Sequence, residues 1–354
     1  MNLKELLHKE SFTREEIISL LKLQKGEEIR ELINRADEVR REYCGEEVHL
    51  RGIIEFSNYC TEDCLYCGLR AGNLKLQRYR MSPEEIIETA KQISNLGIFT
   101  IVLQSGEDSY YDKDLIAYII YSIKQYSDVA ITLSIGEREF DEYRIWKLAG
   151  ADRYLLKHET ANPKLYSIYH NKQKLEDRIK HLEFLKSLGY QIGSGNIVGL
   201  PMQTEEDIAD DILLCSKLDL DMAAFGPFIP APNTPYRRRK AGNVMLTLKT
   251  MAVARIVLKN VHIPATTALA TIDEAGRIKG LTSGANVIMP DFTPMKYRQY
   301  YEIYPNRNTI KDDPSAVKAL LTMQLESIGR KISSGKGDSL KLIFGNDKIS
   351  HYPY

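Results

Sequence analysis

Hydrophobic and polar residues along the chain follow two alternating patterns. Short runs rich in Val, Ile, Leu and aromatic residues are separated by longer segments whose apolar positions recur every three to four residues. The first pattern indicates buried strands and the second indicates amphipathic helices. We count eight candidate strands, at residues 48–56, 100–104, 130–134, 153–157, 191–198, 222–226, 262–268 and 285–289.

Capping signals mark the ends of the helical segments. Thr13 and Glu16 have the spacing of a capping box and open an amphipathic helix, and a second, charged helix is expected over about 27–43. Ser82 is the expected N-cap of a helix at 83–96. Further helices are expected at 114–126, 174–188 and 204–218. Three glycines that each precede a strand are expected helix C-caps: Gly97, Gly150 and Gly189.

Alternating strands and helices predict an α/β fold with parallel strands. Eight strand–helix units within about 240 residues match the size of a (β/α)₈ TIM-type barrel, and an open doubly wound sheet is the alternative. We expect an N-terminal helical extension at 1–46, the barrel at 47–305, and a C-terminal helical appendage and tail at 306–354. Within the last, a helix over 314–332 is expected to precede a polar, mobile end.

Charge and hydropathy narrow the class of partner. Lys+Arg and Asp+Glu both number 48, so no basic footprint suggests a nucleic acid or an anionic membrane as partner. No apolar run reaches the ~18 residues of a transmembrane helix, and the N-terminus lacks a signal-peptide core. A cytoplasmic location is expected.

Three of the five cysteines lie within eight residues, and this cluster needs a chemical explanation. Cys60, Cys64 and Cys67 directly follow the first expected barrel strand, so they should lie at the C-terminal face, where such barrels place their active sites. The odd cysteine count and the expected reducing compartment argue against a disulfide framework. Three thiolates on one loop can hold an iron–sulfur cluster and leave its fourth iron without a protein ligand. A zinc site is the competing interpretation, but no fourth ligand stands at a suitable spacing, and an inert thiol cluster is a further alternative.

The CxxxCxxC spacing, with Tyr66 just before the last cysteine, resembles the signature of the radical S-adenosylmethionine superfamily. The resemblance implies one 4Fe–4S cluster on Cys60, Cys64 and Cys67, with S-adenosylmethionine chelating the open iron. It also implies reductive cleavage of S-adenosylmethionine to a deoxyadenosyl radical. Residues at successive strand ends then match groups that bind the cosubstrate: Tyr66, Gln104, Gly106, Glu107, Thr132, Ser134, Glu159, Arg178 and Ile197. Taken singly, each of these residues could equally be an ordinary turn, packing or surface residue.

The cysteines outside the loop narrow the kind of radical enzyme. Only Cys44 and Cys215 remain, too few for the sacrificial second cluster of biotin synthase or lipoyl synthase, and both are expected to be buried apolar thiols. From about residue 12 to residue 331 the chain resembles the E-type maturases of FeFe hydrogenases, whose relatives include methylornithine synthase and biotin synthase. Six stretches carry the resemblance: 51–58, 101–108, 152–163, 226–230, 263–268 and 284–290.

The closer resemblance implies a substrate, partners and a cavity. The substrate would be a small organometallic or amino-acid-derived molecule, in the first place a cysteine-bound iron carbonyl–cyanide precursor, and the partners would be other maturases and a reductant. Thr266 and Thr267 would bind a carboxylate, Lys157 would supply a charge, and Met222, Met289 and Tyr301 would wall the cosubstrate or substrate. Without the resemblance, Met is more often core filler, and Tyr301 belongs to a tyrosine-rich run that could simply pack the end of the barrel.

Two positions depart from the family pattern. No cysteine follows Cys215, so only one cluster is expected, although some maturases carry a second cysteine trio near the C-terminus. Lys157 stands where an arginine is expected, and lysine offers a point charge without the bidentate fork. Two alternatives stay open: an amino-acid radical enzyme of the methylornithine synthase type, and a non-catalytic iron–sulfur carrier or scaffold.

Overall fold

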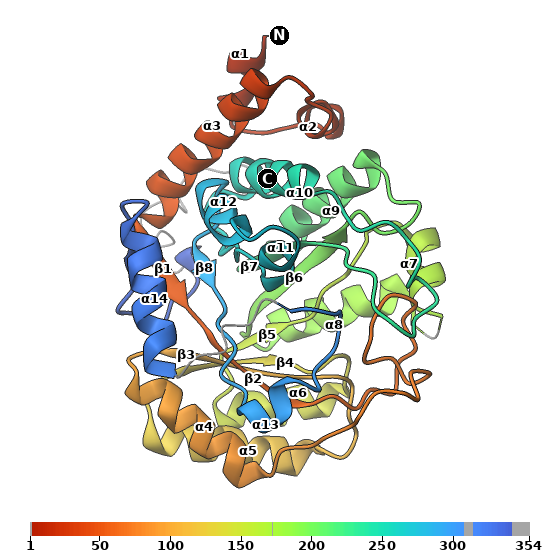
Figure 1. Cartoon of the computed structure of the whole chain (residues 1–354), viewed down its shortest axis with the longest axis vertical. Helices are drawn as coiled ribbons and strands as arrows, with labels where there is room; N and C mark the ends of the chain where they lie inside the picture. Colours follow the sequence, from red (N-terminus) through yellow and green to blue (C-terminus); the bar gives the residue numbers. More distant parts are fainter. Residues whose placement is uncertain (1, 172, 308–313, 342–354) are drawn as a thin grey trace.

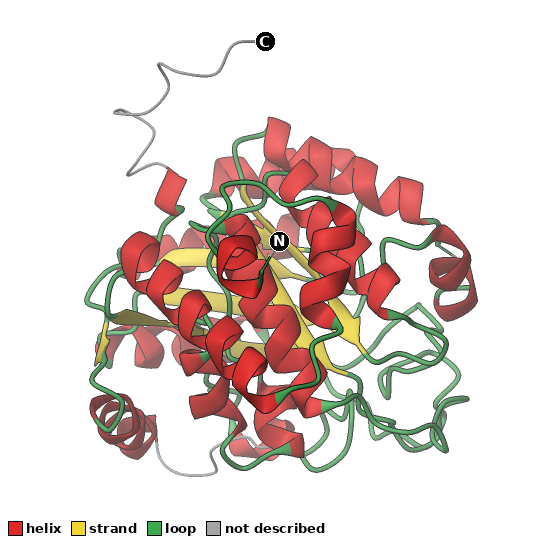
Figure 2. Ribbon diagram, turned by 90° about the horizontal axis from the view of Figure 1, so that it is seen from above, coloured by secondary structure: helices red, strands yellow, loops and turns green. Residues whose placement is uncertain are grey.

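A ring of parallel strands forms the centre of the computed structural model, which describes residues 2–171, 173–307 and 314–341. Six strands pair in sequence order, each parallel to the next. They are β2 (Gly52–Ser57), β3 (Thr100–Ser105), β4 (Ala130–Ser134), β5 (Arg153–Leu155), β6 (Gln191–Val198) and β7 (Met222–Pro227). Figure 2 shows these strands enclosed by helices, with the long loops gathered to one side.

The ring is completed by shorter pairings. Bridges join Met222 to His262 and Pro264 to Val287. The short strand β8 (Val287–Ile288) pairs with β1 (Glu47–Leu50), which leads into β2 after Arg51. Eight parallel segments therefore follow one another around the barrel, as the predicted (β/α)₈ fold class requires.

The strands expected at 153–157 and 285–289 are shorter in the structure, at Arg153–Leu155 and Val287–Ile288, and two others differ in their pairing. The strand expected at 48–56 is divided at Arg51, because β1 pairs with β8 while β2 pairs with β3. The strand expected at 262–268 makes only isolated bridges. Pro264 has no N–H to give to a ladder, and Thr266 already caps the short helix α11 (Thr267–Ile272).

Helices cover the outside of the ring (Figure 1). Thr13, Ser82 and Thr204 each form a capping box, which confirms the predicted helix starts at α2, α4 and α9. Gly97, Gly150 and Gly189 all have positive φ, as expected of residues that end helices. The barrel helices are α4 (Pro83–Asn95), α5 (Lys113–Tyr126), α6 (Phe140–Ala149), α7 (Pro163–Tyr169), α8 (Leu175–Ser187), α9 (Glu205–Lys217), α10 (Val244–Leu258), α11, α12 (Gly276–Thr282) and α13 (Met295–Arg298).

Three N-terminal helices lie on one side of the barrel, namely α1 (Leu3–Leu7), α2 (Arg14–Leu21) and α3 (Gly26–Cys44). α3 packs along α10, and α2 packs on α9 and α10. This cover explains why α10 is apolar on nearly all sides and buried along most of its length. Among the described helices, none is both long and apolar enough to span a bilayer.

The chain end returns to the base of the barrel. Helix α14 (Pro314–Glu326) stops before the expected 332, because the chain turns at Gly329 and forms β9 (Lys331–Ile332) parallel to β1. Residues 333–341 then cross the N-terminal ends of the strands, and we call them the base segment. The expectation of a mobile end after Ser333 is wrong for these residues, and the rest of that expected end, 342–354, lies outside the described residues.

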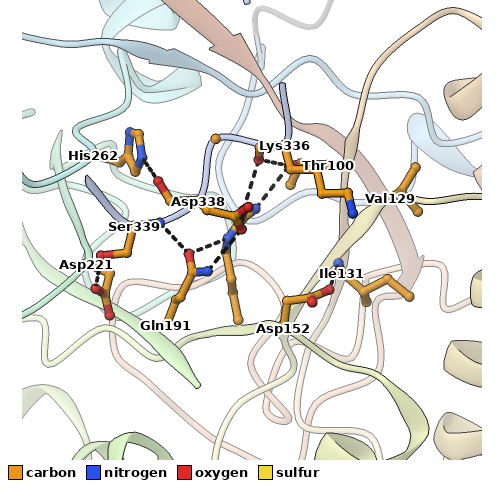
Figure 3. Close-up of polar contacts among 12 residues, drawn as sticks. Thr100, Val129, Ile131, Asp152, Gln191, Asp221, His262, Lys336, Asp338 and Ser339 are labelled. Carbon is orange, nitrogen blue, oxygen red and sulfur yellow. Dashed lines mark hydrogen bonds and ion pairs between the residues drawn. The ribbon is translucent and has the colours of Figure 1, made fainter. Parts of the chain in front are cut away.

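Partly buried hydrogen bonds hold the base segment (Figure 3). Arg153, at the start of β5, donates to the backbone oxygen of Lys336 and to the Asp338 carboxylate, at 2.9 and 2.8 Å. His262 Nε2 lies 2.9 Å from the backbone oxygen of Asp338, and Ser339 Oγ donates to Asp221 at 2.5 Å. The base segment therefore closes the barrel at the end opposite the cysteine loop.

Candidate active site

The cysteine loop follows β2 and is attached to three neighbouring elements. The Thr61 N–H donates to the backbone oxygen of Glu107 after β3 (3.0 Å), and the Leu65 N–H donates to that of Tyr169 at the end of α7 (3.0 Å). Gly68 donates to the Ile303 oxygen at 2.9 Å. A Cβ on Gly68 would stand 1.9 Å from the backbone oxygen of Glu302, so only glycine fits this approach. The cysteines are thus positioned by backbone contacts distant in sequence.

The three thiols share one electrostatic environment. Burial raises the pKa of Cys67 to about 12, with the Cys60 charge as the second cause. Burial likewise raises the pKa of Cys64, followed by the charges of Cys67 and Cys60. Three neighbouring thiolates are therefore unfavourable unless a cationic group binds them. Sulfur as the common donor fits iron–sulfur chemistry.

A histidine lies next to the cysteine loop. Cys64 Sγ lies 3.2 Å from His170 Nδ1, and the other ring nitrogen of His170 lies 3.0 Å from the Tyr66 hydroxyl. Within the described ranges, no three His, Cys, Asp or Glu residues are grouped as ligands of a single metal ion. Cys215 is buried as expected, whereas Cys44 is partly exposed.

The barrel contains a cavity of about 360 Å³ that reaches Cys64 and Cys67. Its walls are mostly apolar, with Leu155, Pro227, Phe228 and Ile229 among them. Ten of the residues predicted for the site line this cavity: Cys64, Tyr66, Cys67, Gln104, Lys157, Glu159, Ile197, Thr266, Thr267 and Met289. The structure therefore brings residues from most of the strand ends to one chamber beside the cysteine loop.

Two predicted residues lie a layer deeper than the chamber. Thr132 and Met222 line a closed cavity of about 20 Å³ together with Arg51, and Met289 borders both cavities. The Thr132 hydroxyl and the Arg51 Nε are buried without a hydrogen-bond partner. The small volume is enough for one water molecule and no more.

The remaining predicted residues surround the cysteine loop. A Cβ on Gly106 would lie 2.2 Å from the backbone oxygen of Tyr59, which explains the glycine at the end of β3. The next N–H, from Glu107, donates to Cys60 Sγ at 3.4 Å. Ser134 ends β4 in register with Gln104, and Tyr301 is buried outside the chamber lining.

Arg178 and Glu107 belong to a buried polar network next to the loop. Arg178 pairs with Glu137 at 2.6 Å and donates to the side chain of Gln173 at 2.6 Å. Gln173 in turn donates to the Glu107 carboxylate at 3.2 Å. Burial raises the pKa of Glu107, and the Arg178 charge opposes that rise. Arg178 therefore has a carboxylate partner within the chain, Glu137.

Lys157 and Glu159 form an ion pair at the chamber wall, with Nζ and Oε2 2.9 Å apart. Glu159 has a positive φ of 60°, because its N–H donates to Gly195 and its C=O accepts from Ile197, which fixes it beside β6. The side chain of Glu159 is therefore presented from a constrained backbone position.

Sequence reasoning missed four polar residues of the site. Glu55 and Arg307 form a buried ion pair at the chamber wall, with one Nη–Oε2 distance of 2.8 Å, and Tyr304 lines the chamber beside them. A carboxylate inside the apolar strand Ile53–Phe56 was a visible signal, since charged residues are rarely buried unpaired. Nothing in the sequence indicated Arg307, which is 252 positions away. His170 was missed for the same reason.

Comparison with known proteins identifies the family. The sequence model of the radical SAM superfamily matches residues 54–215. The chain is 49% identical over 327 residues to the [FeFe] hydrogenase maturase subunit HydE of Thermotoga maritima, covering 92% of this chain and 94% of that protein. The chain belongs to the HydE family of radical SAM enzymes. Both the predicted resemblance and the predicted enzyme class are confirmed.

More distant relatives share the fold of the HydE family. The 3-methylornithine synthase of Methanosarcina acetivorans is 32% identical over 276 residues, covering 77% of this chain and 78% of that protein. The crystal structure of methylornithine synthase (PylB) superposes with a TM-score of 0.80 at 25% identity, covering 94% of this chain and 97% of that one. The maturase HydG from Carboxydothermus hydrogenoformans shares the fold at a TM-score of 0.78 and 22% identity, covering 93% and 77% of the two chains.

Proposed function

We propose that this chain acts in the maturation of the di-iron centre of FeFe hydrogenase, on a cysteine-bound iron carbonyl–cyanide precursor. The observation that carries the proposal is the 360 Å³ chamber, with Cys64 and Cys67 at one side and Lys157, Thr266 and Thr267 on its wall. A reactive carbon radical needs such an enclosure, which keeps water and foreign C–H bonds away.

Cys60, Cys64 and Cys67 would hold one 4Fe–4S cluster. When bound, the cluster and S-adenosylmethionine supply a deoxyadenosyl radical through one-electron cleavage of the sulfonium. The chain's part is to bind and orient the cosubstrate. We assign this to Tyr66, Gln104, Gly106, Glu107, Thr132, Ser134, Glu159, Arg178, Ile197, Met222, Met289 and Tyr301. For Thr132 and Met222, which lie below the chamber, and for buried Tyr301, the role would be support of the wall.

Thr266, Thr267 and Lys157 would hold the substrate. Thr266 Oγ1 already accepts the Leu269 N–H as the cap of α11, at 3.3 Å, which fixes its side chain at the chamber wall. The Thr267 hydroxyl can donate to a carboxylate, and Lys157 adds a positive charge. Because Glu159 pairs with Lys157, a bound carboxylate would compete with Glu159 for the ammonium group.

The partners follow from this chemistry. Other maturases would deliver the precursor and receive the product, and a reductant would supply the electron. A cytoplasmic setting agrees with five cysteines that form no disulfide. We also keep the division into extension (1–46), barrel (47–305) and appendage (306–354) as a proposal.

Amino-acid radical chemistry is the second candidate function. The observation that favours it is the combined likeness to methylornithine synthase, at 32% sequence identity for one relative and a TM-score of 0.80 for a solved structure. An amino-acid substrate would use the same carboxylate-binding residues, so the two candidates differ in the rest of the ligand.

The test is anaerobic reconstitution with iron and sulfide, reduction with dithionite, and EPR spectra with and without S-adenosylmethionine. A reduced 4Fe–4S signal that changes with the cosubstrate, together with deoxyadenosine and maturation of an apo-hydrogenase in vitro, is expected. Cys64→Ala should abolish all three, and Cys215→Ala serves as the control outside the loop. Deoxyadenosine without maturation would favour the second candidate, and a cluster indifferent to S-adenosylmethionine would refute both.

A further inference from the structure

Four exposed cations lie in the connection between β7 and α10: Arg237, Arg238, Arg239 and Lys240. We call them the basic run. Within the described parts of the chain, none of the four has an ion-pair partner. The chain as a whole carries equal numbers of basic and acidic residues, 48 of each, so this local excess of positive charge is not an average property. A concentrated unpaired charge of this kind extends its field into solvent.

The basic run is fixed directly beside the cysteine loop. The Tyr236 N–H donates to the backbone oxygen of Leu65 at 3.3 Å, and Leu65 follows Cys64. The Tyr236 ring packs edge-on against Tyr169 and Phe228, with centroids 6.2 and 6.4 Å away. A rigid apolar cluster therefore holds the basic run at the outer side of the loop (Figure 1, beside α7).

Two exposed apolar side chains lie on the elements that contribute Tyr169 and Leu200 to this cluster. Ile168 on α7 is 42% exposed, and Met202 in the turn after β6 is 60% exposed. The Tyr169 hydroxyl donates to the Pro201 oxygen at 2.6 Å, which joins these two elements to each other. Apolar contacts with a charged surround are the usual composition of a protein-binding surface.

The opposite side of the cysteine loop has a different charge pattern. A hollow of about 380 Å³ beside Thr61 is lined by five carboxylates: Glu107, Asp108, Glu137, Glu139 and Glu142. Three of them are neutralised by arginines, in the pairs Asp108–Arg80, Glu137–Arg178 and Glu142–Arg138, at 2.8, 2.6 and 2.7 Å. The other two, Glu107 and Glu139, have no arginine partner among the described residues, so this side of the loop keeps negative charge. The concentrated positive charge beside the loop lies on the side of the basic run.

We propose that the basic run, with Ile168 and Met202, is the docking surface for an acidic one-electron carrier protein that reduces the cluster on Cys60, Cys64 and Cys67. This inference rests on the proposed function, which requires an electron at that loop. With a flavodoxin as carrier, the anionic flavin hydroquinone loses one electron and becomes the neutral semiquinone, and the oxidised cluster gains that electron. No bond is made or broken in this step.

Electrostatic docking has a defined salt dependence. Exposed charges are screened at separations beyond about 8 Å at physiological ionic strength, so the attraction should weaken strongly between 20 and 200 mM salt. Redox encounter complexes bury little surface and depend on such steering. The association rate should therefore change more than the dissociation rate when the basic run is altered.

The test uses the reconstituted protein and a purified acidic flavodoxin. Binding is followed by fluorescence anisotropy, and cluster reduction by anaerobic stopped flow with the flavodoxin hydroquinone. Arg238→Glu/Lys240→Glu should weaken binding about tenfold or more at 20 mM salt and slow the reduction in parallel, with a smaller difference at 200 mM. The matched control is Arg30→Glu/Lys217→Glu, which reverses two exposed charges far from the loop and should bind as the parent does. Equal binding by the two double variants, or binding indifferent to salt, would overturn the proposal.

A chemical reductant separates this proposal from the proposed function. Dithionite needs no docking surface, so deoxyadenosine formation driven by dithionite should be the same in both double variants and the parent. If dithionite supports cleavage in all three while flavodoxin also reduces all three equally, the docking surface is wrong and the proposed function stands. If dithionite fails in the parent, the proposed function itself is refuted.

Discussion

Arg307 binds Glu55 with both of its terminal nitrogens, although the two residues are 252 positions apart. The Glu55 side chain is fully buried at the chamber wall, and that of Arg307 is 10% exposed. Burial raises the pKa of Glu55 to about 8, and the Arg307 charge opposes this rise. The ion pair joins β2, which carries Glu55, to the segment that carries Arg307. It therefore holds one wall of the chamber in place.

Arg307→Met should destabilise the protein and change the charge of the chamber. Loss of one partner from a buried pair costs about 3–5 kcal/mol, reduced here because Glu55 can take up a proton. Denaturant unfolding should therefore show a large loss for the single variant and a smaller one for Glu55→Gln/Arg307→Met. Strictly additive losses in the two single variants would contradict the assigned pairing.

Lys157→Met should spare cluster assembly and weaken use of the substrate. The substitution removes the positive charge at the chamber wall and leaves Glu159 without its partner, but it touches no cysteine. Iron content and dithionite-driven deoxyadenosine formation should stay within about twofold, while maturation falls by about tenfold or more, which is the effect of losing one charged hydrogen bond. Lys157→Arg is the informative companion, since it restores the charge with a bidentate group. Normal maturation by Lys157→Met would refute the role.

Gly68→Ala should disturb the cysteine loop. The added Cβ would meet the backbone oxygen of Glu302 at 1.9 Å, and a carbonyl in the main chain cannot move aside as a side chain can. We expect a loss of roughly 1–3 kcal/mol in stability and a lower iron content after reconstitution. Gly72→Ala is the control in the same loop, because its Cβ would meet only the flexible ends of Asp63 and Arg70. Similar iron contents in the two variants would show that the approach at Gly68 is not required.

His262 should make the protein sensitive to acid. Burial holds the pKa of His262 well below its usual value, and the Arg51 charge acts in the same direction. The unfolded chain then takes up the proton first, so the free energy of unfolding is highest above pH ~6.5 and falls as the pH drops, by up to about 1.4 kcal/mol per unit. His49 adds to this fall, since its pKa is lowered to about 4 mainly by burial.

Denaturant unfolding curves measured between pH 7 and pH 5 test this acid sensitivity. His262→Gln should reduce the slope of stability against pH, and His8→Gln, at an exposed site, should leave it unchanged. A slope unaffected by His262→Gln would show that another group causes the acid sensitivity.

The local signals in the sequence predicted most helices and strands well, because helix caps and hydrophobic periodicity depend on residues only a few positions apart. The capping boxes at Thr13, Ser82 and Thr204 and the loop of three cysteines are of this kind. Contacts between residues far apart in the chain could not be predicted from these local signals. Arg307 at Glu55, His170 at Cys64 and Asp338 at Arg153 are polar pairs created only by closure of the barrel. The early end of α14 has the same origin, since β1 offers an edge that β9 occupies.

The pairing of β9 with β1 has a consequence for folding during translation. The Arg330 side chain donates to the backbone oxygen of Glu46, which is 284 positions away. The strand β1 can therefore pair with β9 only after residue 332 has been translated. Until then, one edge of β1 is an open template for other chains, and Arg153 has no carboxylate from the base segment. If translation stopped before Asp338, the barrel would lack the last part of the base segment at the N-terminal ends of its strands. The base segment is therefore needed before a newly synthesised barrel can be closed at the N-terminal ends of its strands.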